Sequence, residues 1–140
     1  MMKREDFVSA ARSYLGTPFH HQGRLKGIGV DCAGLVVLAA RDCGYTIRDM
    51  QGYATIPSQN LFMQSVMEHC TPIAIGDVLP GDVAMFRFDS EPQHIAIISD
   101  IAPDITLLHA YQQAGKVCEN HMRGLWHTRL CGFYRLKGIE

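Results

Sequence analysis

The sequence predicts a single α+β domain that spans residues 1–140, with helices in its first half and an antiparallel sheet in its second half. Apolar residues in the first half recur at helical spacing. The second half consists of short runs of β-branched, aromatic and aliphatic residues that are separated by turn residues. The links between these runs are too short for crossover helices, which favours antiparallel pairing. A chain of 140 residues is long enough for one core and too short for two.

Two helices are predicted from their apolar pattern and their end signals. Residues 4–15 carry apolar side chains at helical spacing, and Gly16 closes this first helix. Residues 31–43 form an apolar, alanine-rich segment with Asp31 as its N-cap. Gly44 stops this second helix.

A third helix is predicted after two irregular stretches, residues 17–29 and 45–57. Ser58 is its N-cap, and it runs to about Cys70, where a Thr-Pro pair ends it. Its apolar stripe consists of Leu61, Phe62, Val66 and Met67. We interpret Met63 and Met67 as residues that fill the core.

The predicted strands are residues 82–88, 94–99, 105–111, 115–119 and 131–136, arranged as a meander. Turn residues such as Pro80-Gly81 and Pro103-Asp104 separate them. We interpret Gly81-Asp82 as a turn before a strand and not as a source of a catalytic carboxylate. The core or its rim is the expected place of three large aromatic residues, Trp126, Phe133 and Tyr134.

Composition and charge exclude several classes of function. The net charge is −1 without basic or acidic blocks, which argues against binding to nucleic acid or to an anionic membrane. No apolar run is long enough to span a bilayer. The N-terminus has no recognisable signal peptide, so we expect synthesis in the cytoplasm.

The five cysteines are widely spaced and odd in number, which favours reduced thiols. Cysteines and histidines do not follow zinc-finger spacing, so we expect no metal site and no cofactor. Cys32 stands apart because it falls in the first turn of the second predicted helix. The helix dipole and the unpaired amides there favour the thiolate. A small buried core cysteine is the alternative interpretation.

Two histidines are predicted to lie together on a hairpin. If its turn centres near Ala102, His94 and His109 are opposite each other or on neighbouring pairs, and alternation puts both on one face. One imidazole could then orient the other. If the helix of Cys32 packs on that face, the thiol meets His94, which is the arrangement that nucleophilic catalysis needs. Two structural histidines on a half-buried sheet are the alternative.

Five segments resemble, in order, the motifs of the NlpC-type cell-wall peptidases, a family of small papain-like cysteine peptidases. They are Leu15-Gly-Thr-Pro-Phe19, Gly29-Val-Asp-Cys-Ala-Gly-Leu-Val36, Leu79-Pro-Gly-Asp-Val83 with Phe86, His94-Ile-Ala-Ile97 and Leu108-His-Ala-Tyr111. Two further segments, Phe19-His-His-Gln22 and Leu25-Lys-Gly27, resemble the branch found among phage tail-assembly genes.

This resemblance implies a papain-like domain in which N-terminal helices pack on the C-terminal sheet. It implies that Cys32 is the nucleophile, His94 the general base and His109 the residue that orients the base. The implied reaction is hydrolysis of an amide in the peptidoglycan stem peptide through a thioester. The implied partners are peptidoglycan and phage tail proteins, and no cofactor is required.

The sequence departs from the family pattern at two places. Ala33 stands where many relatives have serine, and Phe19 stands where many have a tyrosine that helps the oxyanion site. Phenylalanine cannot donate a hydrogen bond, so His20 and His21 become candidates for this role, with His20 preferred. Asp31, beside the nucleophile, is a further candidate for the oxyanion or substrate site.

Two other functions remain open at the level of sequence. One is a structural tail-tip component that keeps the fold without turnover. The other is a thiol amidase or acyltransferase that acts on a substrate outside the cell wall.

Overall fold

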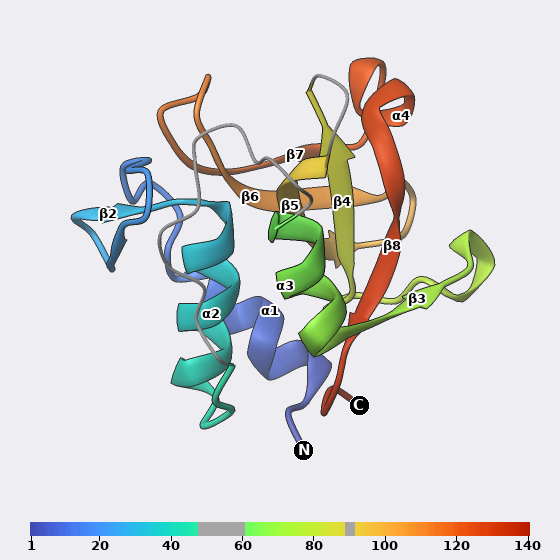
Figure 1. The fold of residues 1–140 in the computed structure, drawn as a ribbon, viewed down its shortest axis with the longest axis horizontal. Coiled ribbons are helices and arrows are strands. Elements are labelled where there is room, and N and C mark those ends of the chain that lie inside the picture. The colour runs from blue at the N-terminus through green and yellow to red at the C-terminus, as the bar shows by residue number, and fades with distance from the viewer. Residues whose placement is uncertain (48–60, 89–91) are drawn as a thin grey trace.

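A computed structural model describes residues 1–47, 61–88 and 92–140. Their main architecture is a six-stranded antiparallel sheet, in the order β3-β8-β4-β5-β6-β7, with helices against it (Figure 1). The α+β class is therefore confirmed. The predicted N-cap Ser58 lies outside the described residues, and so do the side chains of Leu61, Phe62 and Met63.

The first two helices follow the sequence pattern closely. Helix α1 spans Arg4–Arg12 and is shorter than predicted, because residues 13–16 form turns before Gly16 reverses the chain at φ +86°. Helix α2 spans Cys32–Asp42, and its N-cap is Asp31, as predicted. Helix α3 spans Leu61–His69 and ends where expected.

Four strands form the predicted meander. They are β4 (Val83–Arg87), β5 (Pro92–Asp100), β6 (Thr106–Tyr111) and β7 (Lys116–His121). The last strand, β8 (Leu130–Leu136), does not continue this meander. It returns to the far side of β4 and separates it from β3 (Cys70–Ile73), so the prediction of a simple meander is wrong for β8.

Several short elements were not predicted. They are the hairpin of β1 (Arg24–Leu25) and β2 (Gly29–Val30), the turn of 3₁₀ helix η1 (Ile75–Asp77) and the helix α4 (Leu125–Arg129). Strand β3 was also missed, because its Thr-Pro pair suggested only the end of a helix. Proline is compatible with β3 because this strand pairs on one side only, at the edge of the sheet.

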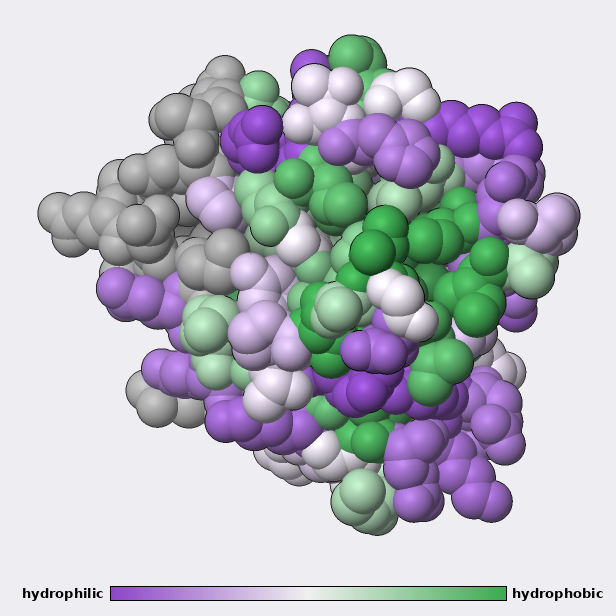
Figure 2. Space-filling view, turned by 90° about the vertical axis from the view of Figure 1, so that its right-hand side faces the viewer, coloured by the Kyte–Doolittle hydropathy of each residue, from purple (hydrophilic) through white to green (hydrophobic). Residues whose placement is uncertain are grey.

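The sheet buries apolar residues on both faces. Helices α1 and α2 cover one face and pack on Val83, Met85, Ile95, Ile97, Leu108 and Ala110. The alternate residues form a second cluster on the other face, with Ala84, Phe86, Ala96, Ile98, Leu107 and Phe133. The side of the molecule that carries β3, β8 and α4 shows hydrophobic residues among polar ones (Figure 2).

The structure corrects the interpretation of one methionine. Met67 is 46% exposed, because it lies on the outer side of α3, and it therefore does not fill the core. Phe133 is buried, whereas Trp126 and Tyr134 are half-buried, in agreement with the predicted core and rim positions. None of the described helices is long and apolar enough to cross a membrane.

Asp82 joins distant parts of the chain. Its fully buried carboxylate accepts hydrogen bonds from Arg4 at 2.9 Å and from Arg135 at 2.9 and 3.0 Å. It also accepts one from the backbone amide of Leu79 at 2.9 Å, which shapes the turn that Gly81 completes. The residue predicted as part of a turn therefore also ties α1 to β8.

Candidate active site

Cys32 is the first residue of α2, and its place is set by its neighbour Asp31. The Asp31 carboxylate is almost fully buried and accepts a hydrogen bond at 2.8 Å from each of three donors. These donors are the amide of Gly34, the amide of Gln22 and the guanidinium of Arg24. Asp31 thus anchors the loop before Cys32 and holds the start of α2 in place.

Glycine at position 34 is required by close packing at this helix start. A Cβ on Gly34 would lie 2.5 Å from the carbonyl oxygen of Gly23 and 2.8 Å from the Arg24 guanidinium. Any side chain there would push the loop away from α2 and separate Arg24 from Asp31. In the Asp-Cys-Ala-Gly segment, Asp31 therefore caps the helix, and Gly34 allows the preceding loop to approach the helix closely.

The thiol of Cys32 is buried, with 8% of the residue exposed. Burial raises the pKa of Cys32 to about 12, and the nearby Asp31 carboxylate adds to this. The backbone amides of Ile95 and Ala33 act in the opposite direction, because they stabilise the thiolate. The expectation that the helix start makes Cys32 a thiolate is therefore wrong for the free protein, because desolvation outweighs the amides and the dipole.

The two predicted histidines do meet. His94 Nε2 lies 2.7 Å from His109 Nδ1, and both rings are buried. The register pairs Ile97 with Leu108, so His109 is level with Ala96 and diagonal to His94, as the hairpin spacing predicted.

Helix α2 does not pack on the face predicted from this alternation. It packs on the Ile95 and Ile97 face, whereas Ala96 and Ile98 belong to the opposite cluster. Cys32 instead comes within hydrogen-bond range of the Ile95 amide, directly beside His94 in the chain. The sheet buries apolar residues on both faces, so alternation could not tell which face would receive the helix.

Two residues at the site were missed in the sequence. Asn120 on β7 accepts a hydrogen bond from His109 Nε2 at 2.6 Å. The predicted strand ended at residue 119, two positions too early, and a longer strand would have put Asn120 diagonal to His109. The ring of Trp126 lies 5.0 Å from that of His109 and 5.9 Å from that of His94. The five-residue helix α4 that carries this tryptophan is too short to show a periodicity.

Aromatic rings enclose the histidine pair. Phe88 stacks on His94 with ring centroids 5.3 Å apart, and Tyr111 stacks on His109 at 5.4 Å. Burial lowers the pKa of His109 to about 4 and lowers that of His94 well below its usual value. Both imidazoles are therefore neutral near pH 7, and a neutral imidazole can accept a proton.

The candidates in the preceding loop lie in different environments. Phe19 packs against the core. His20 is exposed, and its Nδ1 donates to the carbonyl of His21 at 3.0 Å. His21 is half-buried, and its Nε2 lies 3.4 Å from the side-chain nitrogen Nε2 of Gln22.

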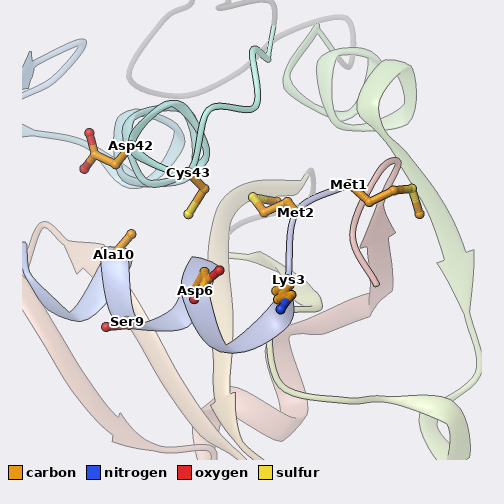
Figure 3. Close-up of a pocket in the computed structure, with 8 residues that line it drawn as sticks. All are labelled: Met1, Met2, Lys3, Asp6, Ser9, Ala10, Asp42 and Cys43. Carbon is orange, nitrogen blue, oxygen red and sulfur yellow. The ribbon is translucent and has the colours of Figure 1, made fainter.

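A separate hollow of about 320 Å³ lies between the start of α1 and the end of α2 (Figure 3). Cys43 points into it from just after α2, and Lys3, just before α1, and Asp6 on α1 line it. The residues predicted for the site do not line this hollow. Among the described residues, no group of histidine, cysteine and acidic side chains could hold a metal ion.

Comparison with solved structures shows the same fold in several proteins. A lipoprotein-like NLP/P60 protein from Staphylococcus aureus has a TM-score of 0.73 at 17% identity, over 95% of this chain and 41% of that one. The peptidoglycan hydrolase RipB from Mycobacterium tuberculosis has a TM-score of 0.66 at 22% identity, over 94% of this chain and 63% of that one. RipD from the same organism, described as a non-catalytic NlpC/p60 domain protein, has a TM-score of 0.65 at 14% identity, over 96% of each chain.

This chain spans about two fifths of the length of the Staphylococcus aureus protein and of a Bacillus cereus NlpC/P60 protein. No curated protein matches the sequence significantly. The sequence model of the NlpC/P60 family matches residues 16–135, which include Cys32, His94, His109 and Asn120. Because this match covers most of the chain and agrees with the fold, the chain belongs to the NlpC/P60 family.

Proposed function

We propose that the protein is a cysteine peptidase that hydrolyses amide bonds in peptidoglycan stem peptides. The observation that carries this proposal is the arrangement of the thiol and the histidine pair. Cys32 lies at the start of α2 beside the Ile95 amide, and the neighbouring His94 is neutral and held by His109. Family membership supports the substrate class, because RipB is described as a peptidoglycan hydrolase, and a further structure with this fold is the NlpC/p60 domain of a peptidoglycan hydrolase, SagA.

The proposed reaction begins with a neutral thiol and a neutral imidazole. His94 takes the proton of Cys32 as the sulfur attacks the scissile carbonyl carbon. The C–N bond then breaks, His94 protonates the leaving amine, and a thioester remains on Cys32. Water, deprotonated by His94, hydrolyses the thioester and restores the thiol.

The oxyanion needs donors at the start of α2. The first amides of a helix have no partner within it, so the Cys32 amide can stabilise the oxyanion. His20 and His21 are the proposed sources of a second donor, since Phe19 cannot supply one. Of the two, His20 is the preferred source, because it can occupy the position of the family tyrosine.

Peptidoglycan binding without turnover is the second candidate function. It is favoured by the burial of the Cys32 thiol, and RipD is described as non-catalytic and adapted to peptidoglycan binding. A thiol amidase or acyltransferase acting on another substrate would use the same residues.

We also propose that the enzyme acts as part of a phage tail. The resemblance of Phe19-His-His-Gln22 and Leu25-Lys-Gly27 to the phage branch supports this. Such a protein would be made in the cytoplasm and would reach the wall within the particle. Mass spectrometry of purified tail particles tests this proposal: it predicts the protein in the particles, and its absence contradicts it.

Incubation with purified peptidoglycan tests the main proposal. We expect soluble stem-peptide fragments with new amino termini, identified by mass spectrometry, from the natural protein and from Cys43→Ala. Cys32→Ala and His94→Ala should release none, because attack and proton transfer then have no substitute. Binding to peptidoglycan without release by the natural protein would favour the second candidate.

A further inference from the structure

The contacts of Asn120 determine where the protons of the two histidines lie. Asn120 Nδ2 donates to the carbonyl oxygen of His121 at 3.1 Å, which sets the orientation of the amide group. Its Oδ1 therefore faces His109 Nε2, at 2.6 Å. A carbonyl oxygen only accepts hydrogen bonds, so His109 must carry its proton on Nε2.

This assignment continues to His94. A neutral His109 with its proton on Nε2 has an unprotonated Nδ1, which accepts a hydrogen bond. The atom 2.7 Å from this Nδ1 is His94 Nε2, so His94 must carry its proton there. The Nδ1 of His94 is then left with a free electron pair. In the proposed reaction, this is the nitrogen that takes the proton of Cys32.

The reverse arrangement would disable the base. If His109 carried its proton on Nδ1, His94 Nε2 would accept that hydrogen bond. The proton of a neutral His94 would then be on Nδ1, and the ring could not accept the thiol proton. The contact between His94 and His109 alone is satisfied in either direction. Only a third group can select one of the two.

We propose that Asn120 is a positioning residue that fixes the proton arrangement of the His94–His109 pair and thereby keeps His94 competent as a base. This inference rests on the proposed function for its consequence in turnover, but the proton positions can be measured independently. Asn120 acts through His109 and is not placed against the substrate. With Asn120, a series of hydrogen-bonded side chains runs from His94 on β5 through His109 on β6 to β7.

The direct test is nitrogen NMR of the histidine rings in the full-length protein near pH 7, where long-range proton–nitrogen correlations distinguish the two tautomers. We expect His94 and His109 both to be protonated on Nε2 in the natural protein. In Asn120→Leu the acceptor is lost, and both rings should populate the Nδ1-protonated form. Lys116→Ala, an exposed change on the same strand, should leave the tautomers unchanged.

Turnover gives the second readout. Asn120→Leu should lower kcat about fivefold to tenfold, the factor that one hydrogen bond supplies, with KM unchanged. Asn120→Asp keeps an acceptor but adds a charge that favours a protonated His109. A protonated His109 donates from its Nδ1 to His94 Nε2. The neutral His94 then carries its proton on Nδ1 and cannot accept the thiol proton. Asn120→Asp should therefore lose activity at low pH and recover it as pH rises.

The titratable groups around His109 are His94 on β5, Tyr111 on β6 and Cys118 on β7, and both variants retain all three. Unchanged tautomers and kcat in Asn120→Leu, or a proton on Nδ1 of His109 in the natural protein, would overturn the proposal. If Asn120→Leu does not fold, the tautomers of the natural protein and the pH dependence of Asn120→Asp serve as the test. Expected tautomers without turnover on peptidoglycan would contradict the proposed function and leave the role of Asn120 intact.

Discussion

Cys32 shows how opposing effects on one residue set its chemistry. The start of α2 supplies amides that stabilise a thiolate, but the residue is buried beside the Asp31 carboxylate. Burial and charge outweigh the amides, so the free protein holds a neutral thiol. In the proposed reaction, His94 removes the proton only as sulfur attacks, which keeps the site unreactive until substrate is present.

We therefore expect Cys32 to be alkylated slowly in the free protein. At pH 7.5, iodoacetamide should label the half-buried Cys43, Cys118 and Cys131 before Cys32. Cys70 provides a matched reference, since burial also raises its pKa to about 12. Timed labelling with mass-spectrometric mapping measures the rates, and in denaturant all five should be labelled alike. Fastest labelling at Cys32 in the native protein would show that the thiolate prevails.

At the scale of elements, α4 and the residue after β4 together limit the access of water to the histidine pair. The side chain of Trp126 contacts both imidazoles from α4, and Phe88 stacks on His94 just beyond β4. These rings keep water from His94 and His109. The low pKa of each histidine follows from this enclosure, since burial disfavours the charged form.

Trp126→Ala should raise the pKa of both histidines towards the ordinary value near 6.5. A base must be unprotonated, so activity is lost as pH falls through its pKa. The natural enzyme should then stay active well below pH 6, and Trp126→Ala should lose activity at a higher pH. The measurement is kcat/KM against pH on a stem peptide. Leu125→Ala, at an exposed neighbouring position, is the control; matching profiles for the two variants would contradict the role of Trp126.

At the scale of the whole molecule, Asp82 holds the two ends of the chain to the sheet. It binds Arg4 near the N-terminus and Arg135 near the C-terminus. The backbone joins the same ends, because the amide of Glu140 donates a hydrogen bond to the carbonyl oxygen of Met2 at 3.0 Å. The termini accordingly lie close together at one end of the molecule (Figure 1).

Asp82→Ala should lower the free energy of unfolding by about 2–4 kcal/mol, because several hydrogen bonds to a buried charge are lost. The loss is limited because Arg4 and Arg135 both reach solvent. Urea denaturation followed by circular dichroism measures the change. Asp77→Ala, at an exposed nearby carboxylate, serves as the control. Equal stabilities of the two variants would show that Asp82 contributes no more than an ordinary surface residue.

Local patterns in the sequence determined much of the fold. Helix α2 and its Asp31 cap, the β4–β7 meander and the meeting of His94 with His109 depend on neighbours along the chain or on one short hairpin. Capping, apolar periodicity and strand alternation act over such distances, so residue order is enough to predict them.

Only the tertiary structure decided the features that depend on contacts between distant segments. The return of β8 beside β4, the face of the sheet that receives α2 and the buried pairs of Asp82 have no local signal. The same holds for Trp126 at the histidine pair and for the neutral thiol of Cys32. Burial by remote residues sets these properties, and a pattern of neighbouring residues does not report which remote residue will cover a side chain.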